Sequence, residues 1–322
     1  MHETFEQLAR MLSTRGLEWL RQKIMDLPDP CPSDHPDLGA LALAGRAAPV
    51  FSGLRGRISP LEVIVLRRLS PDLVRSAAQR ILAGNRDQVT VNLVLAGSLV
   101  AQSDPVWQLA CEELADDKTL PLAIRLSLCD DPALRLVAEQ ALIRPHRHIT
   151  SGQVVAYTNL LMQIYHYGAI RPRLMDARSF SKIYDNLQDM LDWALEQGCT
   201  STLARVAFCL LLVDPDHDIS DTVADLIQVQ RADGSFPPRL GFSTDHQDFD
   251  TGVLPTLWAT LALKMATHRR WKGPALVWLS EQPYRNVAKI CADTAEKLLD
   301  GQMPRLEDAV ALTRATGRDW IG

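Results

Sequence analysis

The sequence predicts an all-α fold, and two observations lead to that prediction. Apolar residues recur at the spacing of one face of an α-helix along most of the chain, and the strict alternation of a half-buried strand is almost absent. Between residues 59 and 143, four Ser-Pro or Asp-Pro pairs each place a capping side chain before a proline at the first helical position. We therefore expect helices to start at these pairs, which are 59–60, 70–71, 104–105 and 131–132.

The first half of the chain is predicted to consist mainly of short helices. An amphipathic helix over residues 4 to 26 is followed by a run of prolines, which no helix interior tolerates. A short helix over residues 38 to 48 comes next, and residues 51 to 57 are predicted to form a glycine-punctuated loop. The short helices of residues 59 to 143 also suit stacked helical pairs of the HEAT type.

The second half is predicted to contain longer helices in consecutive antiparallel hairpins. Residues 144 to 148 interrupt the helical pattern, and they mark a domain boundary or a long crossing loop. We expect residues 1 to 143 to form an N-terminal helical region and residues 151 to 322 to form the hairpins. Helices are expected over residues 151–167, 179–197, 201–212, 220–231, 252–267, 274–281, 284–299 and 306–316.

The composition excludes several classes of protein. A net charge of −5, from 34 basic and 39 acidic residues, gives no electrostatic footprint for nucleic acid. No apolar run approaches the roughly 20 residues that a membrane span needs. The first residues carry acid where a secretory signal carries Lys or Arg, and the six cysteines form no Cys-x-x-Cys pair. We therefore expect a cytoplasmic protein with reduced thiols.

One segment carries the strongest local pattern. The amphipathic helix predicted over residues 220 to 231 ends in the run QRADGSF at 230–236, and the acidic turn DFDTG at 248–252 opens a second apolar helix. Gly234 tolerates the positive φ that often follows a helix, and Phe236 can fold back onto that helix. The segment is therefore predicted to form a helical hairpin.

This hairpin resembles the QW-type repeat of the terpenoid cyclase and protein prenyltransferase superfamily, whose fold is an α/α toroid of antiparallel helical hairpins. The resemblance is specific over residues 220 to 265 and looser from residue 151 to the C-terminus. It implies a toroid in at least the second half of the chain. Residues 1 to 143 would either complete that ring or form a separate HEAT-like layer.

The acidic turn is similar to a truncated form of the D-x-D-D-T-A acid motif of proton-initiated terpene cyclases. Asp248 and Asp250 match the first two acids, and Thr251 stands in the place of the third. The resemblance implies that Asp248 and Asp250 match acids of that motif. Our hypothesis is that these two residues supply the acid or bind a metal, that His246 or Tyr165 assists proton transfer, and that Trp258, on the second helix of the hairpin, contacts the substrate.

The acidic turn has two other interpretations. Asp250 or Thr251 caps the following helix and Asp248 is a solvated loop residue, which fits the preference of a helix N-terminus for an ionised carboxylate. Alternatively, the imidazole and three carboxylates of residues 245 to 250 bind a divalent cation. No other cofactor is expected.

The helix predicted over residues 151 to 167 carries three of the five tyrosines. Helical spacing puts Tyr157 and Tyr165 on one face and rotates Tyr167 away from it. These side chains would line a substrate cavity, with His166 as a base near physiological pH. The alternative is that the rings only pack between neighbouring helices.

Two functions follow from these patterns. The first is an enzyme of specialised metabolism that promotes acid-assisted cyclisation, isomerisation or elimination of a hydrophobic small molecule. The second is a non-catalytic helical scaffold that binds a peptide or a protein partner. The hairpin and its acidic turn favour the enzyme, whereas the missing third acid and the short Pro-capped helices favour the scaffold.

Overall fold

The computed structural model describes residues 2–129, 131–146, 148–169, 174, 177–241 and 248–268. These ranges contain thirteen α-helices, two short 3-10 helices and no strand, which confirms the predicted all-α class. In chain order they are α1 (His2–Met25), α2 (Leu38–Arg55), α3 (Pro60–Arg68), α4 (Pro71–Leu82), α5 (Gln88–Ala96), η1 (Gly97–Leu99), α6 (Pro105–Asp116), α7 (Leu122–Leu128), α8 (Pro132–Leu142), α9 (Ser151–Ile164), η2 (His166–Gly168), α10 (Ala177–Gln197), α11 (Thr200–Val213), α12 (Ser220–Val229) and α13 (Phe249–His268).

All four predicted Pro-containing helix starts are confirmed. The side chains of Ser59, Ser70, Asp104 and Asp131 each accept a hydrogen bond from a backbone N–H in the first turn of α3, α4, α6 and α8. The donor-to-acceptor distances lie between 2.8 and 3.4 Å. Each proline occupies a first-turn position whose N–H has no partner within the helix.

The prediction of a loop over residues 51 to 57 is wrong. Helix α2 continues through this segment to Arg55 and ends at Gly56, which has a left-handed φ of 75°. Phe51 and Leu54 are fully buried in the continued helix. Their removal from water outweighs the poor helix propensity of the glycine between them.

Helix α13 begins at Phe249, three residues before the start that its sequence predicts. Phe249 is buried, and its ring meets the edge of Trp19 on α1 with 6.2 Å between ring centroids. This contact draws the acidic turn into the helix, so that Asp250 lies in the first turn.

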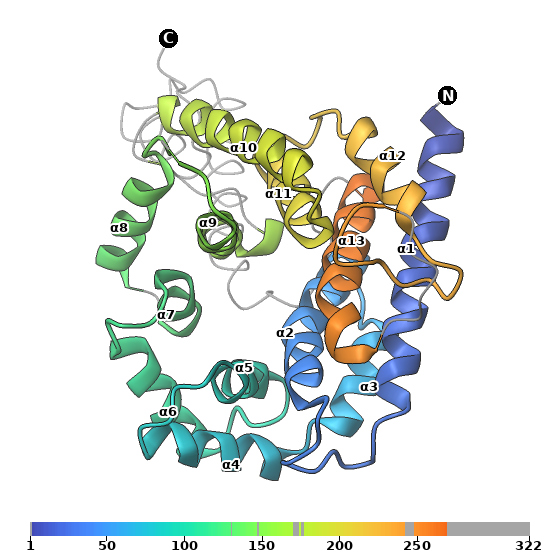
Figure 1. Cartoon of the computed structure of the whole chain (residues 1–322). Helices are drawn as coiled ribbons and strands as arrows, with labels where there is room; N and C mark the ends of the chain where they lie inside the picture. Colours follow the sequence, from blue (N-terminus) through green and yellow to red (C-terminus); the bar gives the residue numbers. More distant parts are fainter. Residues whose placement is uncertain are drawn as a thin grey trace, which may run out of the picture.

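Six helices follow one another in space, and we call them the inner helices: α13, α2, α5, α7, α9 and α11. Helix α13 packs against α2 and α11, α2 packs against α5, and α9 packs against both α11 and α7, while α6 joins α5 to α7. The remaining helices pack on the outside of this set, so that the described chain has a circular arrangement (Figure 1). The toroid itself stays a prediction, because the helices expected between residues 274 and 316 lie outside the described residues.

Buried apolar side chains form one cluster that runs from Ala9 on α1 to Met265 on α13. Helix α11 is buried along nearly its whole length. Residues on both sides of the boundary predicted at 144–148 contribute to this cluster, and the division into domains stays a prediction. None of the described helices is both long and apolar enough to cross a membrane.

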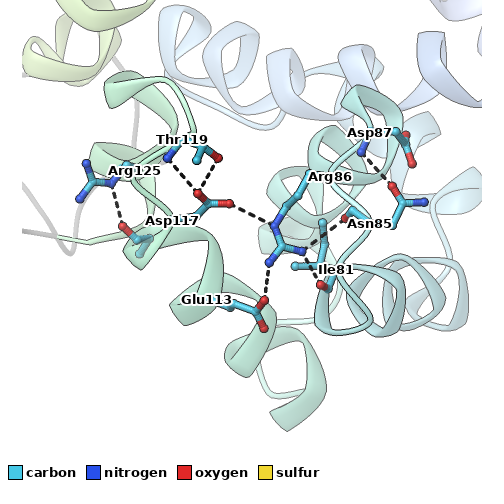
Figure 2. Close-up of polar contacts among 9 residues, drawn as sticks. Ile81, Asn85, Arg86, Asp87, Glu113, Asp117, Thr119 and Arg125 are labelled. Carbon is cyan, nitrogen blue, oxygen red and sulfur yellow. Dashed lines mark hydrogen bonds and ion pairs between the residues drawn. The ribbon is translucent and has the colours of Figure 1, made fainter.

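Arg86 shows how the outer helices are held together. It lies between α4 and α5, and it forms ion pairs with Glu113 and Asp117 of the α6 region (Figure 2). Its Nη1 also donates to the carbonyl oxygen of Ile81, at the end of α4. The Asp117 carboxylate in turn accepts hydrogen bonds from the backbone N–H and the hydroxyl of Thr119, at 2.9 and 2.6 Å. The charge of Arg86 is therefore balanced where it fastens the α4–α5 loop to α6.

Candidate functional site

The turn at residues 230 to 236 joins three helices. Gly234 has a φ of 95°, as its place after the helix predicts. The Gln230 side chain donates to the carbonyl oxygen of Gly234 at 3.0 Å and to that of Leu12 on α1 at 2.9 Å. Phe236 is fully buried, and its backbone N–H donates to Thr256 Oγ1 on α13 at 2.9 Å.

Side chains of α1 also donate hydrogen bonds to this turn. Arg15 Nη2 donates to the carbonyl oxygens of Arg231 and Ala232 at 3.2 and 2.7 Å, and Trp19 Nε1 donates to Asp233 Oδ2 at 3.2 Å. Gly16 lies so close to α13 that a methyl group on it would overlap Thr260 Oγ1. We call the contacts of α1 with residues 230 to 236 and with α13 the closing seam, since they join the first and the last described helices.

The acidic turn lies at the surface. Asp248 directly precedes α13, where its carbonyl oxygen accepts from the backbone N–H of Gly252 at 2.9 Å and from Thr251 Oγ1 at 3.4 Å. The Asp248 and Asp250 side chains are both exposed. Asp250 and Trp258 share α13, but eight residues of helix separate them by about 12 Å. His246 lies outside the described residues.

Tyr157 has the packing role of the alternative interpretation. Its hydroxyl is buried and donates to the carbonyl oxygen of Leu142 at 2.9 Å, and its ring meets the edge of His146. Asn186 Nδ2 on α10 donates to the same Leu142 oxygen at 2.9 Å. Burial raises the pKa of Tyr157 above its ordinary value. The hydroxyl therefore fastens the end of α8 to α9 and α10.

The other predicted residues of this segment do not lie on a continuous helix. Helix α9 ends at Ile164, and His166 and Tyr167 take left-handed φ values of 44° and 54°. The helical spacing that relates Tyr167 to Tyr157 in the sequence therefore does not apply. Tyr165 is almost fully buried, Tyr167 accepts a hydrogen bond from Gln163 at 3.0 Å, and the His166 ring lies 3.5 Å from an Arg135 nitrogen.

Arg205 is the functional candidate that sequence reasoning missed. It lies on α11, with only 5% of its surface exposed. Its Nε donates to Thr158 Oγ1 at 3.2 Å, its Nη2 donates to Asn159 Oδ1, and its guanidinium stacks 4.2 Å from the centre of the Trp258 ring. The sequence does hold a signal, because Arg205 is the one charged residue between Glu196 and Asp214.

Arg205 gathers side chains from several inner helices, and we call this group the interior cluster. Trp258 on α13 meets the edge of Phe208 on α11 at a centroid distance of 6.3 Å. Tyr167 and Arg46, on η2 and α2, lie near enough to affect the pKa of Arg205. Of the predicted site residues, Trp258 contacts Arg205, and Tyr167 acts on the pKa of Arg205 without a contact between the two. The structure does not place Asp248 or Asp250 beside Arg205.

The interior cluster holds a positive charge at an energetic cost. Burial lowers the pKa of Arg205 to about 10; Cys209 and Tyr167 raise it, and the charge of Arg46 lowers it. A change from 12.5 to about 10 corresponds to roughly 3 kcal/mol against the charged form. Burial also raises the pKa of the neighbouring Cys209 thiol to about 12. At neutral pH the cluster therefore contains a guanidinium cation beside a neutral thiol.

No carboxylate among the described residues forms an ion pair with either arginine of the interior cluster. Arg46 is half-buried, and its Nη1 donates to the neutral Asn92 Oδ1 at 2.7 Å. The partners of Arg205 are also neutral. Among the described residues, the positive charge of Arg205 therefore lies beside the Trp258 ring without a carboxylate partner.

The described residues contain no group of three or more His, Cys, Asp or Glu side chains that could hold a metal ion. Of the ligands predicted within residues 245 to 250, only Asp248 and Asp250 belong to the described ranges.

No family model matches the chain, and neither does a curated protein or a solved structure. The resemblance of residues 220 to 265 to the terpenoid cyclase toroid therefore rests on the residues of that segment alone.

Proposed function

We propose that this protein is a cytoplasmic enzyme of specialised metabolism, built as an α/α toroid, that acts on a hydrophobic small molecule. The substrate would lie against the interior cluster, and the reaction would be an acid-assisted cyclisation, isomerisation or elimination. The observation that carries the proposal is the stacking of Trp258 and Arg205 between α9, α11 and α13. An aromatic ring next to a fixed cation offers a substrate both an apolar surface and an orienting charge.

Asp248 and Asp250 would supply the acid from the start of α13. Because Asp250 and Trp258 are about 12 Å apart along the helix axis, a substrate that reaches both must be an extended molecule. The free thiols of the five described cysteines and the circular packing of the helices support the reduced compartment and the toroid.

Mass spectrometry of small molecules that co-purify with the full chain tests this function. We expect a hydrophobic molecule from the wild-type protein and about tenfold less of it from Trp258→Ala, since a well-packed aromatic anchor contributes much of a site's affinity. Trp193→Ala is the matched control, because Trp193 is a half-buried tryptophan on the outer helix α10. Equal recovery from both variants would contradict the assignment of the substrate to the interior cluster.

The acid role is tested with the molecule so identified. We expect Asp248→Asn/Asp250→Asn to lower turnover by about a hundredfold or more, as the loss of a general acid does. Full turnover by the double variant would remove Asp248 and Asp250 from the mechanism and leave the binding function standing.

A second function, the helical scaffold, is favoured by large apolar side chains exposed on outer helices. Leu109 on α6 is 54% exposed, and Leu136 and Val137 on α8 are 45% and 52% exposed. Apolar surface of this kind is typical of protein contacts when it is contiguous. Crosslinking in cell extract followed by peptide identification tests it: a defined protein partner that Leu136→Asp/Val137→Asp no longer captures would favour the scaffold over the enzyme.

A further inference from the structure

We propose that Arg205 anchors an anion-binding subsite in the interior cluster, which takes the oxyanion head group of the substrate. This inference rests on the proposed function for the hydrophobic tail of that substrate. The head group would be a carboxylate or a phosphate, because the planar guanidinium matches the geometry of both. Arg46 would contribute a second positive charge.

The hydrogen bonds of Arg205 fix its orientation without neutralising it. Thr158 Oγ1 donates its own proton to the carbonyl oxygen of Val154 at 2.7 Å, so it meets Arg205 only as an acceptor. Asn159 accepts from Nη2 through its Oδ1. Both partners are uncharged, and Nη1 makes no hydrogen bond with a described residue. The guanidinium is thus held rigidly with donors still available.

The Trp258 ring defines the geometry of the subsite. It covers one face of the guanidinium at 4.2 Å, so an anion must approach in the guanidinium plane, where the N–H groups point. Phe208 contacts this ring in an edge-on arrangement. The apolar tail of a ligand would lie against these aromatic rings.

Charge provides the driving force. A buried cation is strongly unfavourable unless an opposite charge meets it, and the described residues offer Arg205 none. Arg46 adds repulsion, since its charge acts on Arg205 in the same direction as burial does. An anion bound to Arg205 would offset both unfavourable effects.

Calorimetric titration of the full chain with three ligands of one tail length tests the subsite. The probes are decanoate, decyl phosphate and the uncharged decanol, each below its aggregation limit. We expect the charged probes to bind the wild-type protein at least about tenfold more tightly than decanol, as one charge-assisted contact implies. Whichever charged probe binds more tightly identifies the head group as carboxylate or phosphate.

Arg205→Gln is expected to abolish the preference for the charged probes. Arg67→Gln is the matched control, because Arg67 is an exposed arginine on α3 and its loss changes the net charge equally. If Arg205→Gln does not fold, as judged by circular dichroism, Arg46→Gln gives the same test from the half-buried side. Arg46→Gln is then expected to weaken the binding of the charged probes and to leave the binding of decanol unchanged.

Several results would overturn the subsite. These are no binding of either charged probe, equal binding of decanol, or an undiminished preference in Arg205→Gln or, where that variant does not fold, in Arg46→Gln. Two further results distinguish a failure of the anion subsite from a failure of the proposed function. If decanol binds as tightly as the charged probes and Trp258→Ala abolishes all three, the hydrophobic site stands and the anion subsite fails. If inorganic phosphate alone binds as tightly as decyl phosphate, and Arg205→Gln abolishes both, the subsite stands and the hydrophobic substrate fails.

Discussion

The closing seam and the interior cluster both use α13, and they differ in where each holds its positive charge: Arg15 of the seam is exposed, whereas Arg205 of the cluster is buried. In the seam, Arg15, Trp19 and Gln230 all donate to described acceptors, and glycines allow the backbones to touch. In the cluster, Arg205 is buried with uncharged partners only. The contacts of the seam thus join helices, whereas the cluster holds the buried charge for which we propose an anionic ligand.

Arg86, between the outer helices α4 and α6, and Arg205, on the inner helix α11, also differ in how their charges are paired. Arg86 is a quarter exposed and has two carboxylates, so its contacts account for its presence (Figure 2). Arg205 is more deeply buried and has none among the described residues. Variants should therefore separate the regions: changes in the seam should act on stability, and changes in the cluster on binding.

The largest effect on stability is expected from Gly234→Ala in the seam. A Cβ there would lie 2.6 Å from the carbonyl oxygen of Arg15, and the residue has a φ of 95°. Strain and overlap together should lower the free energy of unfolding by about 3 kcal/mol or more. Urea denaturation measures this loss. Gly84→Ala is the control, since Gly84 has a φ of 92° and open space around it, and we expect it to lose only about 1 kcal/mol.

Gly16→Ala should follow, with a loss of about 2 kcal/mol from overpacking against Thr260. Because Thr260 Oγ1 is buried without a hydrogen-bond partner among the described residues, Gly16→Ala/Thr260→Ala should recover most of this loss. Gly152→Ala in α9, where a Cβ meets nothing within 4 Å, should be neutral or slightly stabilising. A double variant no more stable than Gly16→Ala would show that α1 and α13 do not meet in this way.

Arg205→Met should change the free energy of unfolding of the unliganded protein by less than about 1 kcal/mol, although it removes a buried contact of the cluster. Relief of the buried charge offsets the loss of the Trp258 stack and of two hydrogen bonds. Thermal and urea unfolding of the ligand-free protein measure it. A loss as large as that of Gly234→Ala would make Arg205 a part of the architecture, like the seam.

The smallest effect is expected at the Arg86 network. Hydrogen bonds from Thr119, together with Arg86, lower the pKa of Asp117 below its ordinary value of 3.8. The ionised carboxylate therefore stabilises the fold at pH values above 3.8. This contribution is lost as the pH falls through the lowered pKa. Wild type and Asp117→Asn should differ modestly at pH 7, and the difference should shrink as the pH falls below 3.8 and vanish below the lowered pKa of Asp117. A difference in unfolding that does not depend on pH would contradict this account.

The local features of the fold were within reach of the sequence, and the long-range ones were not. The Ser-Pro and Asp-Pro starts and the positive φ of Gly234 follow from neighbouring residues. The extension of α2 through Gly53 depends on the burial of Phe51 and Leu54, which tertiary packing decides. The end of α9 at Ile164 likewise has no clear marker in the sequence.

The residues of the candidate site were also beyond local sequence patterns. The acidic turn at 248–252 is conspicuous in the sequence, yet both of its aspartates lie in water. Arg205 contacts Thr158 and Trp258, which are 47 and 53 positions away in the chain. No local sequence pattern predicts such long-range contacts. The lone charge within the apolar run of α11 was the available signal.

The closing seam joins two segments that are made far apart in time during synthesis. Helix α1 leaves the ribosome before its main partner α13, which is made more than 200 residues later. At roughly 5–20 residues per second, the apolar face of α1 waits on the order of 10–50 s for that partner. A nascent chain halted before α13 would lack Phe249, the ring that meets Trp19 in the folded protein.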